Sequence, residues 1–256
     1  MFFASAELQL IYKVANAPIQ MFPYPHIHVQ DVFPADFYRA LREHLPPAGA
    51  YKTLKALGRV GNEYPDTRGV LPLMPDDIAA LAEPYRAFWH ETARWLLGGP
   101  FGQVVLQKFG DLLGQRFENP MAVRYHHEAL VIQDRTHYAL GPHTDSPAKV
   151  FSFLFYLPDD ASKPHLGTSM YVPKDPAFTC PGGPHHSFDK FRRLLTVPYV
   201  PNSLFAFMKT PNAFHGVEPI AEPDIERALL LYDVKVLEAP AVSAYSATMP
   251  RTQFSF

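Results

Sequence analysis

The chain has 256 residues, of which 47% are hydrophobic and 14% aromatic, and its formal net charge is −2. This length and apolar content are enough to bury a sizeable core, most simply within one domain. The near-neutral charge argues against a nucleic-acid-binding surface, which needs clustered lysine and arginine, and the single cysteine, Cys180, excludes an intrachain disulfide and suits a reducing cytoplasm.

The N-terminal third of the sequence predicts mostly helices. Its first eight residues lack a basic segment, and Glu7 interrupts their apolar run, so we expect neither a signal peptide nor a membrane span. Prolines at the first turn and apolar residues at helical spacing mark the starts and faces of the helices, and Pro84 should divide the second one. Helices are expected over residues 34–45, 75–97 and 101–117.

From Met121 onward the pattern changes to aromatic and β-branched runs separated by proline and glycine, which is typical of strands and turns. No internal repeat or low-complexity segment is present. By itself, this pattern supports a mainly β protein with a helical N-terminal third. Strands are expected over residues 150–157, 167–172, 202–207, 213–220 and 227–236.

Candidate metal ligands are interleaved with these strands. Because side chains in a strand repeat every two residues, His143 and Asp145 should point to the same side and bind one metal ion together. His215, from a distant strand, would complete a facial triad. Two imidazoles and one carboxylate leave about three positions open on an octahedral ion, as expected for non-haem Fe(II) enzymes that also bind oxygen. Arg227 follows 12 residues after His215.

Together, these residues resemble the 2-oxoglutarate and Fe(II)-dependent dioxygenases, within their prolyl-4-hydroxylase-like branch. The resemblance covers residues 22–46, where a strand leads through Phe33 and Pro34 into a helix, and residues 119–237. The matching features of the second region are a tyrosine before His-x-Asp, a strand followed by Gly-Thr, then His-Gly-Val and a basic residue.

The resemblance implies a double-stranded β-helix, or jelly roll, made of two facing antiparallel sheets. It implies that His143, Asp145 and His215 bind Fe(II) and that Arg227 binds the distal carboxylate of the co-substrate 2-oxoglutarate; a guanidinium can make two parallel charge-assisted hydrogen bonds to that group. Tyr138 is a further candidate for contact with 2-oxoglutarate. The implied reaction uses molecular oxygen, releases succinate and carbon dioxide, and oxidises a C–H bond of a small-molecule or peptide substrate. Because Asp145 is present, no position is freed for a halide, which favours hydroxylation over halogenation.

The expected organisation is a single domain over residues 1–256. It comprises a mostly helical flank over 1–118, a jelly-roll core over 119–237 and a tail over 238–256. The sequence departs from the family in having one glycine before Thr168, where two are common, and in the segment 173–201, which has no counterpart in the family pattern. This segment is expected to be an insertion that contributes to substrate selectivity.

Other readings of the same residues remain open. His126 and Glu128, with His-x-Glu spacing, form a second pair of possible metal ligands. Arg227 could pair with Glu226 or Asp224 on the surface. Tyr138 could serve only in packing. His185 and His186, in a Gly-Pro loop, are expected to face solvent or substrate, and Cys180 is expected to be an inert thiol. At the level of function, the alternatives are a catalytically inactive jelly-roll module that binds a metal or ligand and a zinc-dependent hydrolase on a similar barrel.

Overall fold

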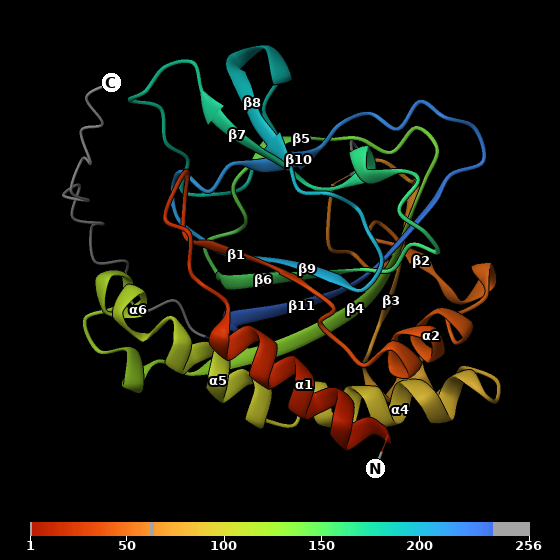
Figure 1. Cartoon of the computed structure of the whole chain (residues 1–256). Helices are drawn as coiled ribbons and strands as arrows, with labels where there is room; N and C mark the ends of the chain where they lie inside the picture. Colours follow the sequence, from red (N-terminus) through yellow and green to blue (C-terminus); the bar gives the residue numbers. More distant parts are fainter. Residues whose placement is uncertain (1, 62–63, 238–256) are drawn as a thin grey trace.

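The computed structural model describes residues 2–61 and 64–237 of the chain (Figure 1). Its helices are α1 (Phe2–Asn16), α2 (Ala35–Glu43), α3 (Pro75–Ala79), α4 (Tyr85–Leu96), α5 (Pro100–Lys108) and α6 (Gly110–Arg116). Its strands are β1 (His26–Gln30), β2 (Lys52–Thr53), β3 (Arg68–Pro72), β4 (Tyr125–Arg135), β5 (Leu140–His143), β6 (Lys149–Tyr156), β7 (Ser169–Pro173), β8 (Phe191–Thr196), β9 (Ser203–Met208), β10 (His215–Val217) and β11 (Glu226–Val236). The expected tail over 238–256 lies outside the described residues.

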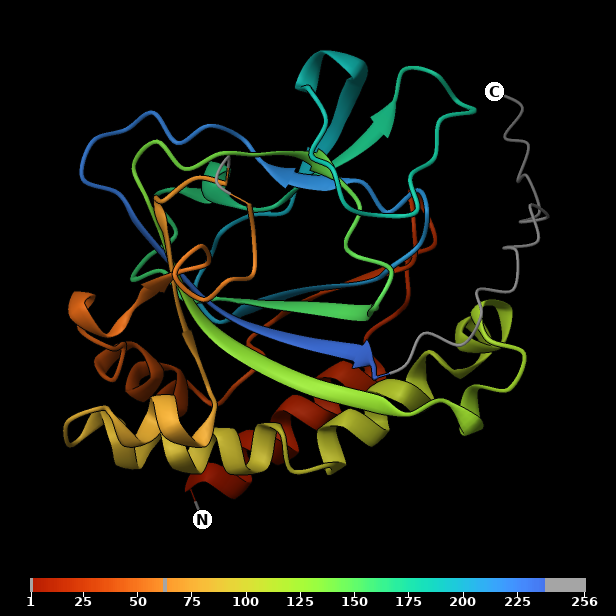
Figure 2. The ribbon, with the colours of Figure 1, turned by 180° about the vertical axis from the view of Figure 1, so that it is seen from behind.

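The strands form two antiparallel sheets that face each other. The larger sheet has the order β1-β9-β6-β11-β4-β3-β2, and the smaller has the order β5-β10-β7-β8. Helices α1, α4 and α5 cover the outer face of the larger sheet, and the smaller sheet lies on its other side (Figures 1 and 2). The predicted jelly-roll core with a helical N-terminal flank is therefore confirmed.

Strand β11 shows how the sequence creates two separate apolar layers. Its even-numbered residues, such as Leu230 and Tyr232, pack with the helices, whereas Leu229 and Leu231 pack between the two sheets. Both faces of the strand are buried, as its nearly continuous apolar sequence requires. The alternation also fixes the direction of Arg227, which must point between the sheets because it is two residues from Leu229.

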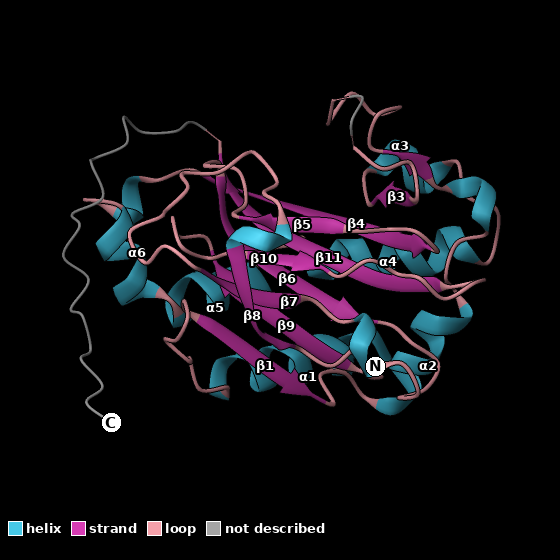
Figure 3. Ribbon diagram, turned by 90° about the horizontal axis from the view of Figure 1, so that it is seen from above, coloured by secondary structure: helices cyan, strands magenta, loops and turns pink. Residues whose placement is uncertain are grey.

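The N-terminal third contributes strands as well as helices. Strand β1 is the strand that the resemblance predicts before Phe33 and Pro34, and it joins one edge of the larger sheet. Strands β3 and β2, which extend the other edge, were not predicted within the mostly helical flank (Figure 3). Helix α1 was not predicted, although it buries Ala6, Leu10 and Val14 at four-residue spacing. In the part of the chain that is described, no helix has the length and apolar character needed to cross a membrane.

The predicted helix boundaries agree with the structure in part. Pro84 separates α3 from α4, as expected from the loss of its backbone donor. The single helix predicted over 101–117 is instead two helices, α5 and α6, which change direction at Phe109. The segment 173–201 is not wholly outside the core, because it contains β8, which pairs with β7.

Gly167, the one glycine that the sequence retains before Thr168, is required by a close backbone contact. A Cβ atom at this position would lie 1.6 Å from the carbonyl oxygen of Val197. We expect Gly167→Ala to lower the free energy of unfolding by about 3 kcal/mol, the upper part of the range for over-packing. Gly49→Ala is the matched control, since a Cβ atom there meets nothing within 4 Å. Equal urea unfolding midpoints for the two variants would contradict this account.

Candidate functional site

The three predicted metal ligands lie together at one end of the smaller sheet. His143 is the last residue of β5 and His215 the first of β10, and the two are paired directly across these strands. Asp145 lies two residues beyond the end of β5. The simple alternation had instead predicted that it lies within the strand. One ligand atom from each residue lies within 4.8 Å of the other two, and His215 Nε2 is 4.0 Å from Asp145 Oδ1. The predicted triad is thus assembled.

Hydrogen bonds orient both imidazoles for metal binding. Nδ1 of His143 is 3.0 Å from the carbonyl oxygen of Gly141, and Nδ1 of His215 is 3.0 Å from that of Ala213. A carbonyl oxygen can only accept, so each Nδ1 carries the proton and each Nε2 keeps a free lone pair. This is the arrangement that metal-binding histidines require.

Burial and neighbouring charges keep the three ligands in their metal-binding forms. Burial lowers the pKa of both His143 and His215, and for His143 the proximity of His215 lowers it further. Burial alone would raise the pKa of Asp145, but the charge of Lys149 and the hydrogen bond from Ser152 hold it below its ordinary value. At neutral pH the site therefore offers two neutral imidazoles and one carboxylate, the protonation states that bind a divalent cation.

A buried polar network holds the carboxylate of Asp145. The ammonium group of Lys149 is 3.3 Å from Asp145 Oδ1 and 3.0 Å from Asp233 Oδ2. The hydroxyl of Ser152 is 2.8 Å from Asp145 Oδ2 and 3.0 Å from Asp233 Oδ1. Burial raises the pKa of Asp233, which Lys149 partly offsets. The oxygen of Asp145 that lies beside the other ligands is Oδ1, 4.0 Å from His215 Nε2, so it is the one placed to bind a metal ion.

Arg227 points into the space between the sheets and is only 1% exposed. Its Nη1 donates to Asp134 Oδ2 at 2.6 Å and its Nε donates to the carbonyl oxygen of Leu166 at 2.5 Å. The alternative that Arg227 pairs on the surface with Glu226 or Asp224 is therefore wrong. Its ion-pair partner is Asp134, on the neighbouring strand β4.

A single cavity of about 70 Å³ connects the triad to Arg227. Its wall includes His143, Asp145, His215, Arg227 and a second arginine, Arg68, which the sequence did not suggest. Lys149, Ser152 and Thr168 also line it, and apolar side chains such as Phe207, Leu229 and Leu231 form the rest of the wall. The site can therefore hold a small molecule that reaches from a metal ion to a guanidinium.

Tyr138 supports Arg68 and is not part of the cavity wall as described. Its side chain is fully buried, its hydroxyl lies 3.2 Å from that of Tyr64, and the Arg68 guanidinium is 4.4 Å above its ring. This position satisfies the polar end of a buried tyrosine. Direct contact of Tyr138 with a co-substrate stays a prediction.

The other candidates from the sequence lie elsewhere. Glu128 is engaged by Arg59 and Lys235, and His126 is exposed, so no second metal-binding group forms among the described residues. Cys180 is buried in a small aromatic cluster, consistent with an inert thiol. His185 is exposed but stands beside the metal ligands, with its ring 4.7 Å from that of His143.

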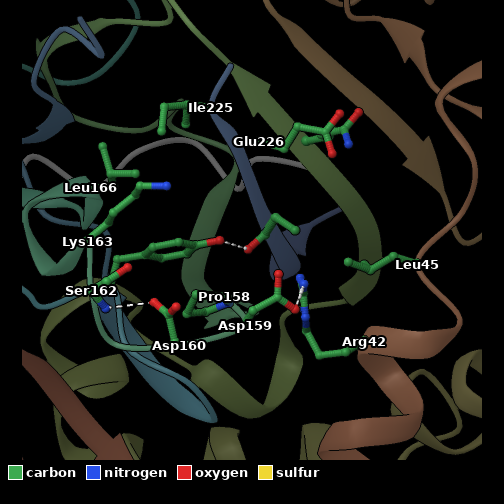
Figure 4. A pocket seen from close by; sticks show the side chains of 13 residues that line it. Arg42, Leu45, Pro158, Asp159, Asp160, Ser162, Lys163, Leu166, Ile225 and Glu226 are labelled. Carbon is green, nitrogen blue, oxygen red and sulfur yellow. Dashed lines mark hydrogen bonds and ion pairs between the residues drawn. The ribbon is translucent and has the colours of Figure 1, made fainter. Parts of the chain in front are cut away.

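A second, larger cavity of about 190 Å³ lies away from the triad (Figure 4). Several of its polar groups have partners within the protein: Arg42 pairs with Asp159, Asp160 accepts from the backbone nitrogen of Ser162, and Tyr199 donates to the carbonyl oxygen of Ala228. It lacks a metal-binding group. We therefore assign the chemistry to the smaller cavity.

Neither a protein family model nor a curated protein matches the sequence. Solved structures do match the fold. A prolyl hydroxylase from Trichoplax adhaerens, in complex with a hypoxia inducible factor peptide fragment, is 11% identical with a TM-score of 0.52, over 90% of this chain and 88% of that one. A prolyl 4-hydroxylase from Phytophthora capsici is 14% identical with a TM-score of 0.51, over 92% and 67%. The predicted resemblance to this branch is confirmed at the level of fold.

Proposed function

We propose that this chain, which has the fold of the prolyl hydroxylases, is an Fe(II)- and 2-oxoglutarate-dependent oxygenase. The observation that carries the proposal is one cavity with two Nε2 lone pairs and a carboxylate at one end and a guanidinium at the other. The fold similarity supports the proposal, and the site carries it, because one fold hosts many functions.

The donor set suits the proposed metal. His143, Asp145 and His215 would hold Fe(II) on one face and leave about three positions open. Arg227 would bind the distal carboxylate of 2-oxoglutarate. When bound with dioxygen, the iron and co-substrate supply an oxidative decarboxylation that releases succinate and carbon dioxide and oxidises an unactivated C–H bond. The apolar wall formed by Phe207, Leu229 and Leu231 would exclude water from this reaction.

The same metal chemistry can act on several classes of substrate. The Trichoplax enzyme is bound to a peptide, and we propose for this chain an amino-acid, peptidyl or small-metabolite substrate. Hydroxylation is the outcome we favour, because Asp145 supplies the carboxylate that a halide would otherwise replace. With its single cysteine the chain suits a reducing compartment, and we propose that it acts in the cytoplasm.

The proposal is tested by adding Fe(II) and 2-oxoglutarate to the purified protein without oxygen. We expect a weak visible absorption band that depends on both additions, followed by succinate release when oxygen enters. Succinate release over a panel of peptides and metabolites would then identify the substrate by stimulation of turnover. Stoichiometric metal binding without a band or succinate would instead select an inactive metal-binding jelly roll.

A further inference from the structure

Three charged side chains form a row across three neighbouring strands between the sheets. Asp134 on β4 stands opposite Arg68 on β3 and opposite Arg227 on β11. Arg68 donates to Asp134 through Nε at 2.6 Å and Nη2 at 2.8 Å, and Arg227 donates through Nη1 at 2.6 Å. Two guanidiniums therefore share one carboxylate, which leaves the row with a net charge of +1.

The two arginines also keep unused hydrogen-bond donors. A guanidinium has five N–H groups, and within residues 2–61 and 64–237 Arg68 uses three of them and Arg227 four. Arg68 uses two on Asp134 and one on the Tyr64 hydroxyl at 3.5 Å, whereas Arg227 uses one each on Leu166, Asp134, Thr168 and Tyr156. Two N–H groups remain on Arg68 and one on Arg227, enough for a further bidentate acceptor.

The position of the row indicates where that acceptor would lie. Arg68 and Arg227 both border the cavity that contains the metal ligands, whereas Asp134 does not. Asp134 is fully buried behind them and holds both guanidiniums in place. A buried net charge with unused donors is costly unless a counter-charge binds. The cavity is therefore built to receive one anion at this end.

We infer that Arg68 binds the distal carboxylate of the co-substrate together with Arg227, with Asp134 as the residue that positions both. The inference rests on the proposed function. One carboxylate brings the row to neutrality, whereas a further carboxylate on the substrate would leave it with a net negative charge. Because Arg227, the proposed partner of 2-oxoglutarate, belongs to the row, the single carboxylate that the row can neutralise is that of the co-substrate. The ring of Tyr138 below Arg68 limits the movement of that guanidinium.

The test compares two co-substrates in the anaerobic Fe(II) protein. Both 2-oxoglutarate and 2-oxopentanoate chelate metal through a keto acid, but only the first has a distal carboxylate. We expect Arg68→Met to weaken 2-oxoglutarate binding about tenfold to a hundredfold, as for loss of charge-assisted hydrogen bonds, and to leave 2-oxopentanoate binding unchanged. Titration of the visible band measures both dissociation constants. Arg39→Met, at an exposed position of α2, is the matched control and should bind both ligands as the parent protein does.

Each other outcome is decisive. The inference is overturned if Arg68→Met binds both ligands with the affinity of the parent protein. It is also overturned if the variant keeps its 2-oxoglutarate affinity but substrate no longer stimulates succinate release, because the anion that Arg68 binds would then belong to the substrate. If Arg68→Met does not fold, Arg68→Lys decides: it keeps the charge but loses the planar fork, so severalfold weaker 2-oxoglutarate binding supports the inference and parental binding overturns it. A parent protein that binds metal but never 2-oxoglutarate overturns the proposed function itself, an outcome distinguishable from failure of the variant alone.

Discussion

Asp145→Ala is expected to abolish metal retention and, with it, succinate release. The substitution removes the only carboxylate of the triad and leaves two neutral imidazoles, which cannot offset the charge of a divalent ion. Loss of groups that merely orient a ligand costs tenfold to a hundredfold in metal affinity, so loss of the ligand itself should exceed about a hundredfold. Calorimetric titration with Mn(II), which is stable in air, measures this loss independently of turnover.

The variant should nevertheless fold, because Lys149 keeps Asp233 as an ion-pair partner. His185→Ala is the matched control: this imidazole lies beside His143 but outside the triad, so its loss should leave Mn(II) affinity within about threefold of the parent, less than the loss of an orienting group costs. If Asp145→Ala bound Mn(II) as tightly as His185→Ala, the carboxylate would not be a ligand and the proposed centre would be wrong.

Lys149→Met is expected to produce the largest loss of stability among the substitutions near the site. The lysine lies between Asp145 and Asp233, and its removal leaves two buried carboxyl groups without a cation. Breaking a buried ion pair in this way costs about 3–5 kcal/mol. Urea unfolding of the metal-free protein measures the difference, and Lys174→Met, at an exposed position, should leave stability unchanged.

The sign of the pH dependence provides a second check on Lys149→Met. Burial and the nearby Asp145 already raise the pKa of Asp233, and loss of Lys149 removes the main opposing charge. In the variant the folded state therefore binds protons more readily than the unfolded chain, and stability must fall as the pH rises through that pKa. The destabilisation should be smaller at pH 5 than at pH 8. A pH-independent difference would show that Lys149 acts through packing alone.

The core strands were predictable because their signals are local. Apolar and aromatic runs marked β6, β9 and β11, and such runs depend on backbone periodicity, which a sequence displays directly. The triad was predictable from the resemblance to the family pattern of His-x-Asp followed by His-Gly-Val and a basic residue. Alternation alone had placed Asp145 in the same strand as His143, whereas it lies two residues beyond the end of β5.

The rest of the site depends on partners that are distant in the chain. Arg68 and Asp134 are 66 residues apart, and Asp134 and Arg227 are 93 apart, so no local pattern links them. One signal was available: Asp134 and Asp233 are charged residues on strand faces that are otherwise apolar, and a buried charge requires a partner. That reasoning predicts that partners exist but not which residues they are.

Strand β8 was missed for a different reason. Four of its six residues are exposed, including Leu194 and Leu195, so it lacks the inward apolar alternation that identifies a strand. It lies at the edge of the smaller sheet, where it pairs only with β7. Helix α1 was missed because its first turn carries neither an acidic residue nor a proline to mark the start of a helix.

The pairing of β5 with β10 is short, with only two pairs of residues in register and an irregularity between them. One of those pairs is His143 opposite His215, and Asp145 lies two residues beyond His143 in the chain. A metal ion bound here would link two strand ends that few backbone hydrogen bonds connect. Acquiring the metal and ordering this rim of the barrel would then be a single event, and a chelator would loosen the rim while the helix-covered sheet stayed intact.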